Sequence, residues 1–170
     1  AYEIRPRDWS SDVCSSDLEN LAKFGVPVVV GINKFNADTE GELATIVKFC
    51  ELRGVKAAVC THWADGSAGA EQLAKFVVEA AESGRTQFKP LYADDMALAE
   101  KARTIAREIY RAKDIAIDSS AATQLKQFED EGFKSLPICM AKTQYSFSTD
   151  PAAKGAPVDH TIELREVRLS

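Results

Sequence analysis

Residues 25–33 read GVPVVVGIN, and this run decides the fold of the first half of the chain. It is rich in β-branched residues, apolar on both faces, and bounded by Gly25 and Asn33. A continuous apolar run of this kind is typical of a strand that is buried on both sides within a parallel sheet. We therefore predict a buried parallel strand here.

A helix and a second strand follow this run. Thr39 and Glu42 form a capping-box pattern, and apolar residues then recur at helical spacing, which predicts a helix over residues 39–53. Residues 55–60 are apolar and predict a second short strand, and residues 70–83 predict another helix.

This alternation of strand and helix predicts an α/β fold with βαβ units and right-handed crossovers. Ligands bind such sheets outside the carboxyl ends of the strands. The loops over residues 33–38 and 61–69 both leave such ends. The sequence therefore predicts that a binding site in this half of the chain lies between these two loops.

The second half predicts a smaller α+β unit. The predicted elements are helices over residues 95–111 and from Ser119 or Ser120 to Gly132, strands over 115–117 and 161–169, and an extended segment over 136–141. We therefore predict a domain over residues 19–93 that forms the end of a parallel sheet, followed by an α+β domain over residues 94–170.

The first eighteen residues, AYEIRPRDWSSDVCSSDL, differ in character from the rest of the chain. They are rich in Ser and Asp and show no periodicity, and residues 8–18 resemble the translation of a common sequencing-adapter oligonucleotide. We interpret residues 1–18 as a non-native or disordered segment and predict that they have no packed position. The alternative is a genuine polar N-terminal arm.

The composition is that of a globular protein with an acidic balance. Hydrophobic residues make up 45% of the 170-residue chain, and its formal net charge is −5. The charge and the scattered Lys and Arg argue against a nucleic-acid partner, and no apolar run is long enough to span a membrane. No signal peptide is visible, and the four cysteines form no C-x-x-C pair, so we expect reduced thiols, a cytoplasmic location and no bound metal.

Residues 33–36 read NKFN and resemble the N-K-x-D motif with which GTPases read guanine. That motif needs an Asp at its fourth position to accept two hydrogen bonds, and this chain has Asn36. The phosphate-binding pattern G-x-x-x-x-G-K-[ST] is also missing from these 170 residues. The sequence therefore argues against a small GTPase.

Phe35 and Trp63 each follow the end of a predicted strand, within a polar loop. If the two strands are neighbours, the rings could stand at the spacing at which a flat heterocycle stacks between them. The alternative is that both rings fold down onto the nearby helices as packing anchors. The residues alone favour this second interpretation.

Two further polar stretches have more than one interpretation. Residues 65–69, DGSAG, precede a helix and could hold an anion on their N–H groups or only cap the helix. Residues 142–146, KTQYS, suit a polar ligand, a domain interface or an ordinary surface turn. No pattern of Ser, Cys or His supports a catalytic nucleophile.

Several stretches together resemble formate–tetrahydrofolate ligase. They are residues 20–21, 24–30, 32–35, 38–39, 108–110, 136–146, 150–151 and 165–168, with Trp63 and the glycine-rich loop that follows it. The most specific is LPICMAKTQYS at residues 136–146. The resemblance extends over residues 19–170 almost without gaps.

The resemblance implies an enzyme that joins formate to tetrahydrofolate through formyl phosphate, with ATP and Mg²⁺, inside a P-loop-NTPase-like domain. In that family the phosphate loop and the main catalytic basic residues lie upstream, so we expect a truncated piece without catalytic residues of its own. The substrates implied are formate, ATP and tetrahydrofolate, and a homo-oligomer is left open. A non-catalytic folate- or nucleotide-binding module is the alternative.

The resemblance also implies roles for individual residues. Phe35 and Trp63 match the family's aromatic pair around the folate, and Asn33 and Asp38 match polar positions of the same loop. Lys142, Thr143 and Gln144 belong to the signature, for which a nucleotide-side role and a structural role are both open. The family usually reads Ala-Lys-Gly-Gly-x-Gly after the tryptophan. Here Asp65 replaces the Lys, which argues against a phosphate contact at that position.

Overall fold

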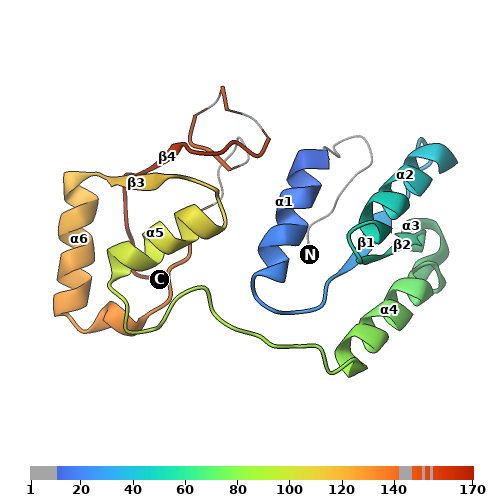
Figure 1. The fold of residues 1–170 in the computed structure, drawn as a ribbon, viewed down its shortest axis with the longest axis horizontal. Helices are drawn as coiled ribbons and strands as arrows, with labels where there is room; N and C mark the ends of the chain where they lie inside the picture. The colour runs from blue at the N-terminus through green and yellow to red at the C-terminus, as the bar shows by residue number, and fades with distance from the viewer. Residues whose placement is uncertain (1–10, 142–146, 151, 154) are drawn as a thin grey trace. The chain divides into compact units, whose positions relative to one another are not determined.

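The computed structural model describes residues 11–141, 147–150, 152–153 and 155–170, with side chains from residue 15 onward. The chain divides into two compact units, Ala1–Phe88 and Lys89–Ser170. Each unit contains a two-stranded parallel sheet with helices beside it (Figure 1). The predicted α/β class is thereby confirmed at this level. Among the described residues, no helix has the length and apolar character needed to cross a membrane.

The first unit contains the predicted strand–helix–strand–helix order. Its elements are α1 (Ser11–Ala22), β1 (Val29–Asn33), α2 (Glu40–Glu51), β2 (Lys56–Cys60), α3 (His62–Asp65), the 3₁₀ helix η2 (Gly66–Ala70) and α4 (Glu71–Glu82). Strands β1 and β2 are parallel, and their register runs from Val29 opposite Lys56 to Asn33 opposite Cys60. The strand begins only after Pro27, because proline has no N–H to donate to a sheet.

Helices α2 and α4 cover opposite faces of this sheet. Val30 and Ile32 of β1 are buried against Leu43, Ile46 and Cys50 of α2. Burial of one such aliphatic side chain stabilises a fold by about 1.5–3 kcal/mol.

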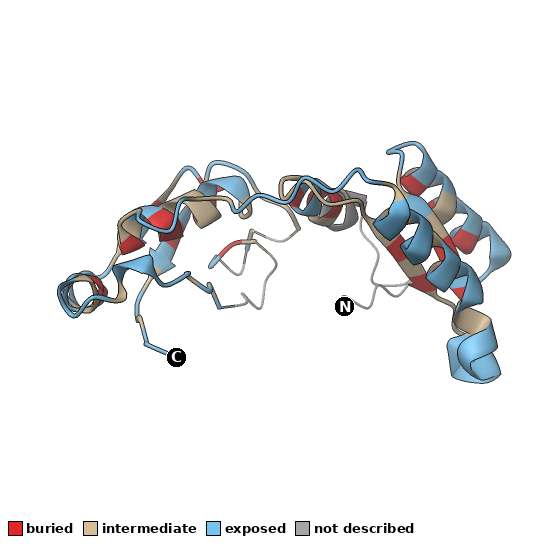
Figure 2. Cartoon of the chain, turned by 90° about the horizontal axis from the view of Figure 1, so that it is seen from below, coloured by how far each residue is buried: buried red, intermediate tan, exposed pale blue. Residues whose placement is uncertain are grey.

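The other face of the sheet is the one on which Gly31 lies. A Cβ built at Gly31 would approach Leu73 Cδ2 of α4 to 2.9 Å. The absence of a side chain at Gly31 therefore allows α4 to pack closely against the strand. Buried residues form patches on the strands and helices, whereas the outer helix turns are exposed (Figure 2).

Helix α1 corrects the prediction that residues 1–18 have no packed position. Its side chains Ser16 and Leu18 are buried, and Leu18 belongs to the same core cluster as Val30. The Ser15 hydroxyl donates to the Glu19 carboxylate at 3.1 Å, which links this part of the helix to the family-like residues after it. Residues 1–10, which include Trp9, lie outside the described residues.

The second unit contains α5 (Leu98–Glu108), β3 (Asp114–Ile117), α6 (Ser119–Asp130), the 3₁₀ helix η3 (Phe133–Ser135) and β4 (Thr161–Leu164). The core cluster consists of small or β-branched residues, namely Ala102, Ala106, Ala112, Ile115 and Ile162. Strand β4 is shorter than the predicted 161–169, because its parallel partner β3 ends at Ile117, opposite Leu164. Residues 136–141 belong to neither a helix nor a strand.

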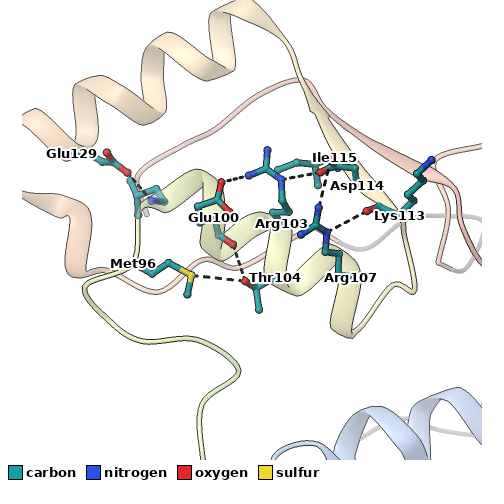
Figure 3. A network of polar contacts seen from close by, with 10 residues as sticks. Met96, Glu100, Arg103, Thr104, Arg107, Lys113, Asp114, Ile115 and Glu129 are labelled. Atoms are coloured by element: carbon teal, nitrogen blue, oxygen red, sulfur yellow. Dashed lines mark hydrogen bonds and ion pairs between the residues drawn. The ribbon is translucent and has the colours of Figure 1, made fainter.

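Charged side chains connect the elements of this unit (Figure 3). Arg103 of α5 forms ion pairs with Glu100 and with Asp114 of β3. The hydrogen bond from Arg103, assisted by the Ile115 N–H, lowers the pKa of Asp114 below its ordinary value of 3.8. Glu129 of α6 accepts a hydrogen bond from the Leu98 N–H at 2.6 Å, so α6 caps the first turn of α5.

Candidate functional site

The two loops predicted to form a site start side by side. Asn33 and Cys60 end their strands opposite each other, and the Lys34 N–H donates to the Cys60 carbonyl at 2.9 Å. A pocket of about 410 Å³ lies beyond these ends. Its lining consists of Lys34, Phe35 and Asn36 from the first loop and Thr61, Trp63, Ala64 and Asp65 from the second. The pocket thus lies at the carboxyl edge of the sheet, where the sequence predicts a binding site.

Phe35 and Trp63 line this same pocket, as predicted from their matched positions after the two strands. Trp63 is 83% exposed, whereas Phe35 is half-buried. With so much exposed surface, the indole of Trp63 does not fold down onto the nearby helices in this structure. An exposed tryptophan beside a second aromatic ring offers a surface on which a flat heterocycle can stack.

Asp38 holds the backbone that carries Phe35. Its carboxylate accepts a hydrogen bond from the Phe35 N–H at 2.7 Å, and its own N–H donates to the Phe35 carbonyl at 3.0 Å. These two bonds close a tight turn, a role for which Asp side chains are well suited. Asp38 is not part of the pocket lining, and neither is Asn33, the half-buried last residue of β1. The structure therefore brings two of the four predicted residues into the pocket.

Lys34 contributes a cation to the pocket wall. Its Nζ lies 2.5 Å from Glu40 Oε1 in the first turn of α2, which fixes the lysine beside the loop. Because the pair is solvent-accessible, its contribution to stability is small, and its main consequence is orientation.

The second loop is helical, which the sequence did not predict. Helix α3 and η2 form two successive turns, and the Thr61 N–H donates to the Gly69 carbonyl at 3.0 Å, which closes them on each other. Trp63 is therefore held on a short helix. The start of α4 has Ala70 as N-cap without a side-chain cap, so the capping role considered for residues 65–69 is not observed. Asp65 and Glu71 flank η2 with negative charge, which opposes an anion there.

Five further lining residues lie within the two loops predicted to form the site but were not assigned to folate individually, namely Lys34, Asn36, Thr61, Ala64 and Asp65. The sequence feature that could have identified them is their position close to Phe35 and Trp63 in the same two loops. Their side chains supply an ammonium group, an amide, a hydroxyl and a carboxylate around an aromatic wall, a combination typical of a small-molecule site. Among the described residues, no group of three or more His, Cys, Asp or Glu side chains could hold a metal ion. Lys142, Thr143 and Gln144 lie outside the described residues.

Comparisons with known proteins agree on one family. The sequence profile of the family described as formate–tetrahydrofolate ligase matches residues 12–170. A formate–tetrahydrofolate ligase of Maricaulis maris (strain MCS10) is 56% identical over 153 residues, which is 90% of this chain and 28% of the relative. The proteins of that name from Sphingobium sp. and Ruegeria pomeroyi are 56% and 52% identical over the same share of this chain. The chain thus spans about 27% of the length of these two relatives.

Proposed function

The chain belongs to the formate–tetrahydrofolate ligase family, and we propose that it is part of an ATP-dependent enzyme that joins formate to tetrahydrofolate to give 10-formyltetrahydrofolate. Family membership favours this activity over a stand-alone folate- or nucleotide-binding module. The intact protein would act on formate, ATP and tetrahydrofolate in the cytoplasm.

One observation supports the folate side of this proposal. Phe35 and Trp63 line one pocket at the carboxyl ends of two adjacent parallel strands, and Trp63 is 83% exposed. The pterin of tetrahydrofolate is a flat, polar heterocycle with an apolar face, which suits an aromatic wall that is rimmed by polar side chains. Aromatic stacking contributes about 0.5–1.5 kcal/mol beyond the burial of area.

The other two predicted folate residues would act differently. Asp38 would act through the backbone of Phe35, because its carboxylate accepts the Phe35 N–H. Asn33 ends β1 opposite Cys60 and directly precedes the lining residue Lys34, and from this position it would contact the ligand.

The proposal that the intact protein binds ATP is supported by its membership of the family. We infer that residues 19–93 form the end of a P-loop-NTPase-like domain, and that residues 94–170 form a smaller C-terminal domain. For Lys142, Thr143 and Gln144 the family signature suggests a nucleotide-side role, with a structural role as the alternative. Mg²⁺ would enter the intact protein together with ATP. The 170 residues contain no G-x-x-x-x-G-K-[ST] pattern, and we assign no catalytic residue among them.

The proposal is tested by tetrahydrofolate binding, measured by anaerobic calorimetry on the purified chain. Trp63→Ala is expected to raise the Kd about tenfold or more, because it removes most of one stacking surface. Leu52→Ala is the matched control, since Leu52 is 77% exposed in the same unit and lies outside the pocket lining. Equal affinities in Trp63→Ala and the unmodified chain would contradict the assignment of this pocket to folate.

A further inference from the structure

Lys101 of α5 is a lysine without any exposed surface. Its relative exposure is 0%, although lysine is among the residues least often buried. Its Nζ donates to three backbone carbonyl oxygens, those of Asp94 at 2.7 Å, Lys134 at 2.8 Å and Leu136 at 3.0 Å. Within the described part of the chain, none of the ion pairs includes Lys101.

This geometry satisfies the ammonium group completely. A lysine ammonium has three N–H donors, and each finds one carbonyl acceptor. The Tyr92 ring centroid lies 5.7 Å from Nζ and adds a weaker cation–π attraction. Burial of a charge is costly unless the charge is paired or fully hydrogen-bonded. The hydrogen bonds to the three carbonyl groups therefore offset the free-energy cost of burying the ammonium group. The three carbonyl oxygens thus surround the ammonium group of Lys101 as they would surround a bound monovalent cation.

The three carbonyl groups come from two segments that flank α5 and α6. Asp94 lies before α5, whereas Lys134 is in η3 and Leu136 follows it. A second contact joins the same two segments, because the Tyr92 hydroxyl accepts a hydrogen bond from the Ile138 N–H at 2.9 Å. Residues 136–138 belong to neither a helix nor a strand. The hydrogen bonds to the Leu136 carbonyl and from the Ile138 N–H therefore help to fix the position of their backbone.

We propose that Lys101 is a positioning residue whose ammonium group holds residues 134–136 and thereby fixes the start of the family signature at Leu136. Tyr92 completes the anchor at Ile138. The chain leaves this anchor directly into residues 139–141. The proposal is independent of the ligand assigned to the first unit, and it gives the opening of the signature a structural role.

The test is hydrogen exchange by mass spectrometry on the whole chain. Lys101→Met keeps the length of the stem and removes the ammonium group, and it is expected to raise exchange at residues 133–138 about tenfold or more. Exchange in β1 of the first unit and in β3 of the second serves as the internal reference. Wild-type exchange at residues 133–138 in this variant would overturn the proposal.

A second variant separates the cation from ordinary packing. Lys101→Ala removes three carbons and the nitrogen, and n-propylammonium replaces these atoms. Protection at residues 133–138 is expected to return with n-propylammonium, but not with n-propanol, which lacks the charge, or tetramethylammonium, which lacks N–H donors. If Lys101→Met unfolds the whole second unit, this rescue decides the question. Equal recovery with n-propanol, or no recovery with n-propylammonium, would refute the role of the ammonium ion.

Discussion

Gly69 is the residue on which the shape of the pocket's second wall depends. A Cβ built at this position would lie 2.5 Å from the His62 nitrogen and 2.5 Å from the Thr61 carbonyl carbon. Both are backbone atoms of the segment that carries Trp63, so they cannot rotate away as a side chain could. The close approach is what lets the Thr61 N–H reach the Gly69 carbonyl.

We therefore expect Gly69→Ala to open the turn formed by α3 and η2. The displaced backbone should lower the free energy of unfolding by about 1–3 kcal/mol, the usual cost of overpacking. Tetrahydrofolate binding should weaken as well, because Trp63 loses its position. Denaturant unfolding and calorimetry measure the two effects.

Gly41→Ala is the matched control for this substitution. Nothing lies within 4 Å of a Cβ at Gly41, which is in the first turn of α2. The change should leave binding unaltered and stabilise the helix by up to about 1 kcal/mol. Unchanged stability and affinity in Gly69→Ala would show that the turn does not need this close approach.

At the scale of elements, α2 links the core to the pocket. Its N-cap, Thr39, accepts a hydrogen bond from the Glu42 N–H, and the Glu42 carboxylate accepts from the Thr39 N–H at 2.8 Å. The cap follows directly on the turn that Asp38 closes around Phe35. The start of the helix and the first pocket wall are therefore one continuous hydrogen-bonded structure.

Thr39→Ala is expected to reduce the stability of the first unit by about 1 kcal/mol, because the first turn of α2 loses its side-chain acceptor. Thr45→Ala in the same helix should change stability by only a few tenths of a kcal/mol, since Thr45 is exposed and bonds only to the Gly41 carbonyl of its own helix. Urea unfolding followed by circular dichroism distinguishes the two variants. Equal losses in both would argue against the capping box as the stabilising feature.

At the scale of the whole molecule, the chain has two units and about 27% of the length of the relatives cited from Sphingobium and Ruegeria. Each unit has its own core cluster, one centred on β1 and α2 and the other on α5 and β3. The pocket proposed to bind folate and the proposed Lys101 anchor belong to different units, so their tests are independent of each other.

This 170-residue chain is expected to catalyse no ATP-dependent formate ligation. Phosphoryl transfer needs positioned cations and backbone donors around the transferred group, and the 170 residues contain no G-x-x-x-x-G-K-[ST] loop. The assay combines the purified chain with formate, ATP, magnesium and tetrahydrofolate. Formation of formyl-tetrahydrofolate above a control without the protein would refute this expectation. Tetrahydrofolate binding in the same preparation shows that the chain is folded.

Local patterns in the sequence determined the elements and the edge of the sheet at which the site lies. The apolar run before Asn33 and the capping box at Thr39 act over a few residues, so they can be recognised without the fold. The rule that parallel strands present their carboxyl ends on one edge then places Phe35 and Trp63 together. The family resemblance supplied the ligand to be tested.

Only the tertiary structure decided the features that depend on distant contacts. The sequence did not predict that Leu18 packs in the core, because one apolar residue in a polar stretch shows no periodicity. The helical form of the second loop depends on the contact between Thr61 and Gly69. From the sequence alone, Lys101 would be taken for a surface lysine. Two of the carbonyl groups that accept hydrogen bonds from its buried ammonium group lie 33 and 35 residues further along the chain. A charge can be buried only where such acceptors converge, and convergence is a property of the fold.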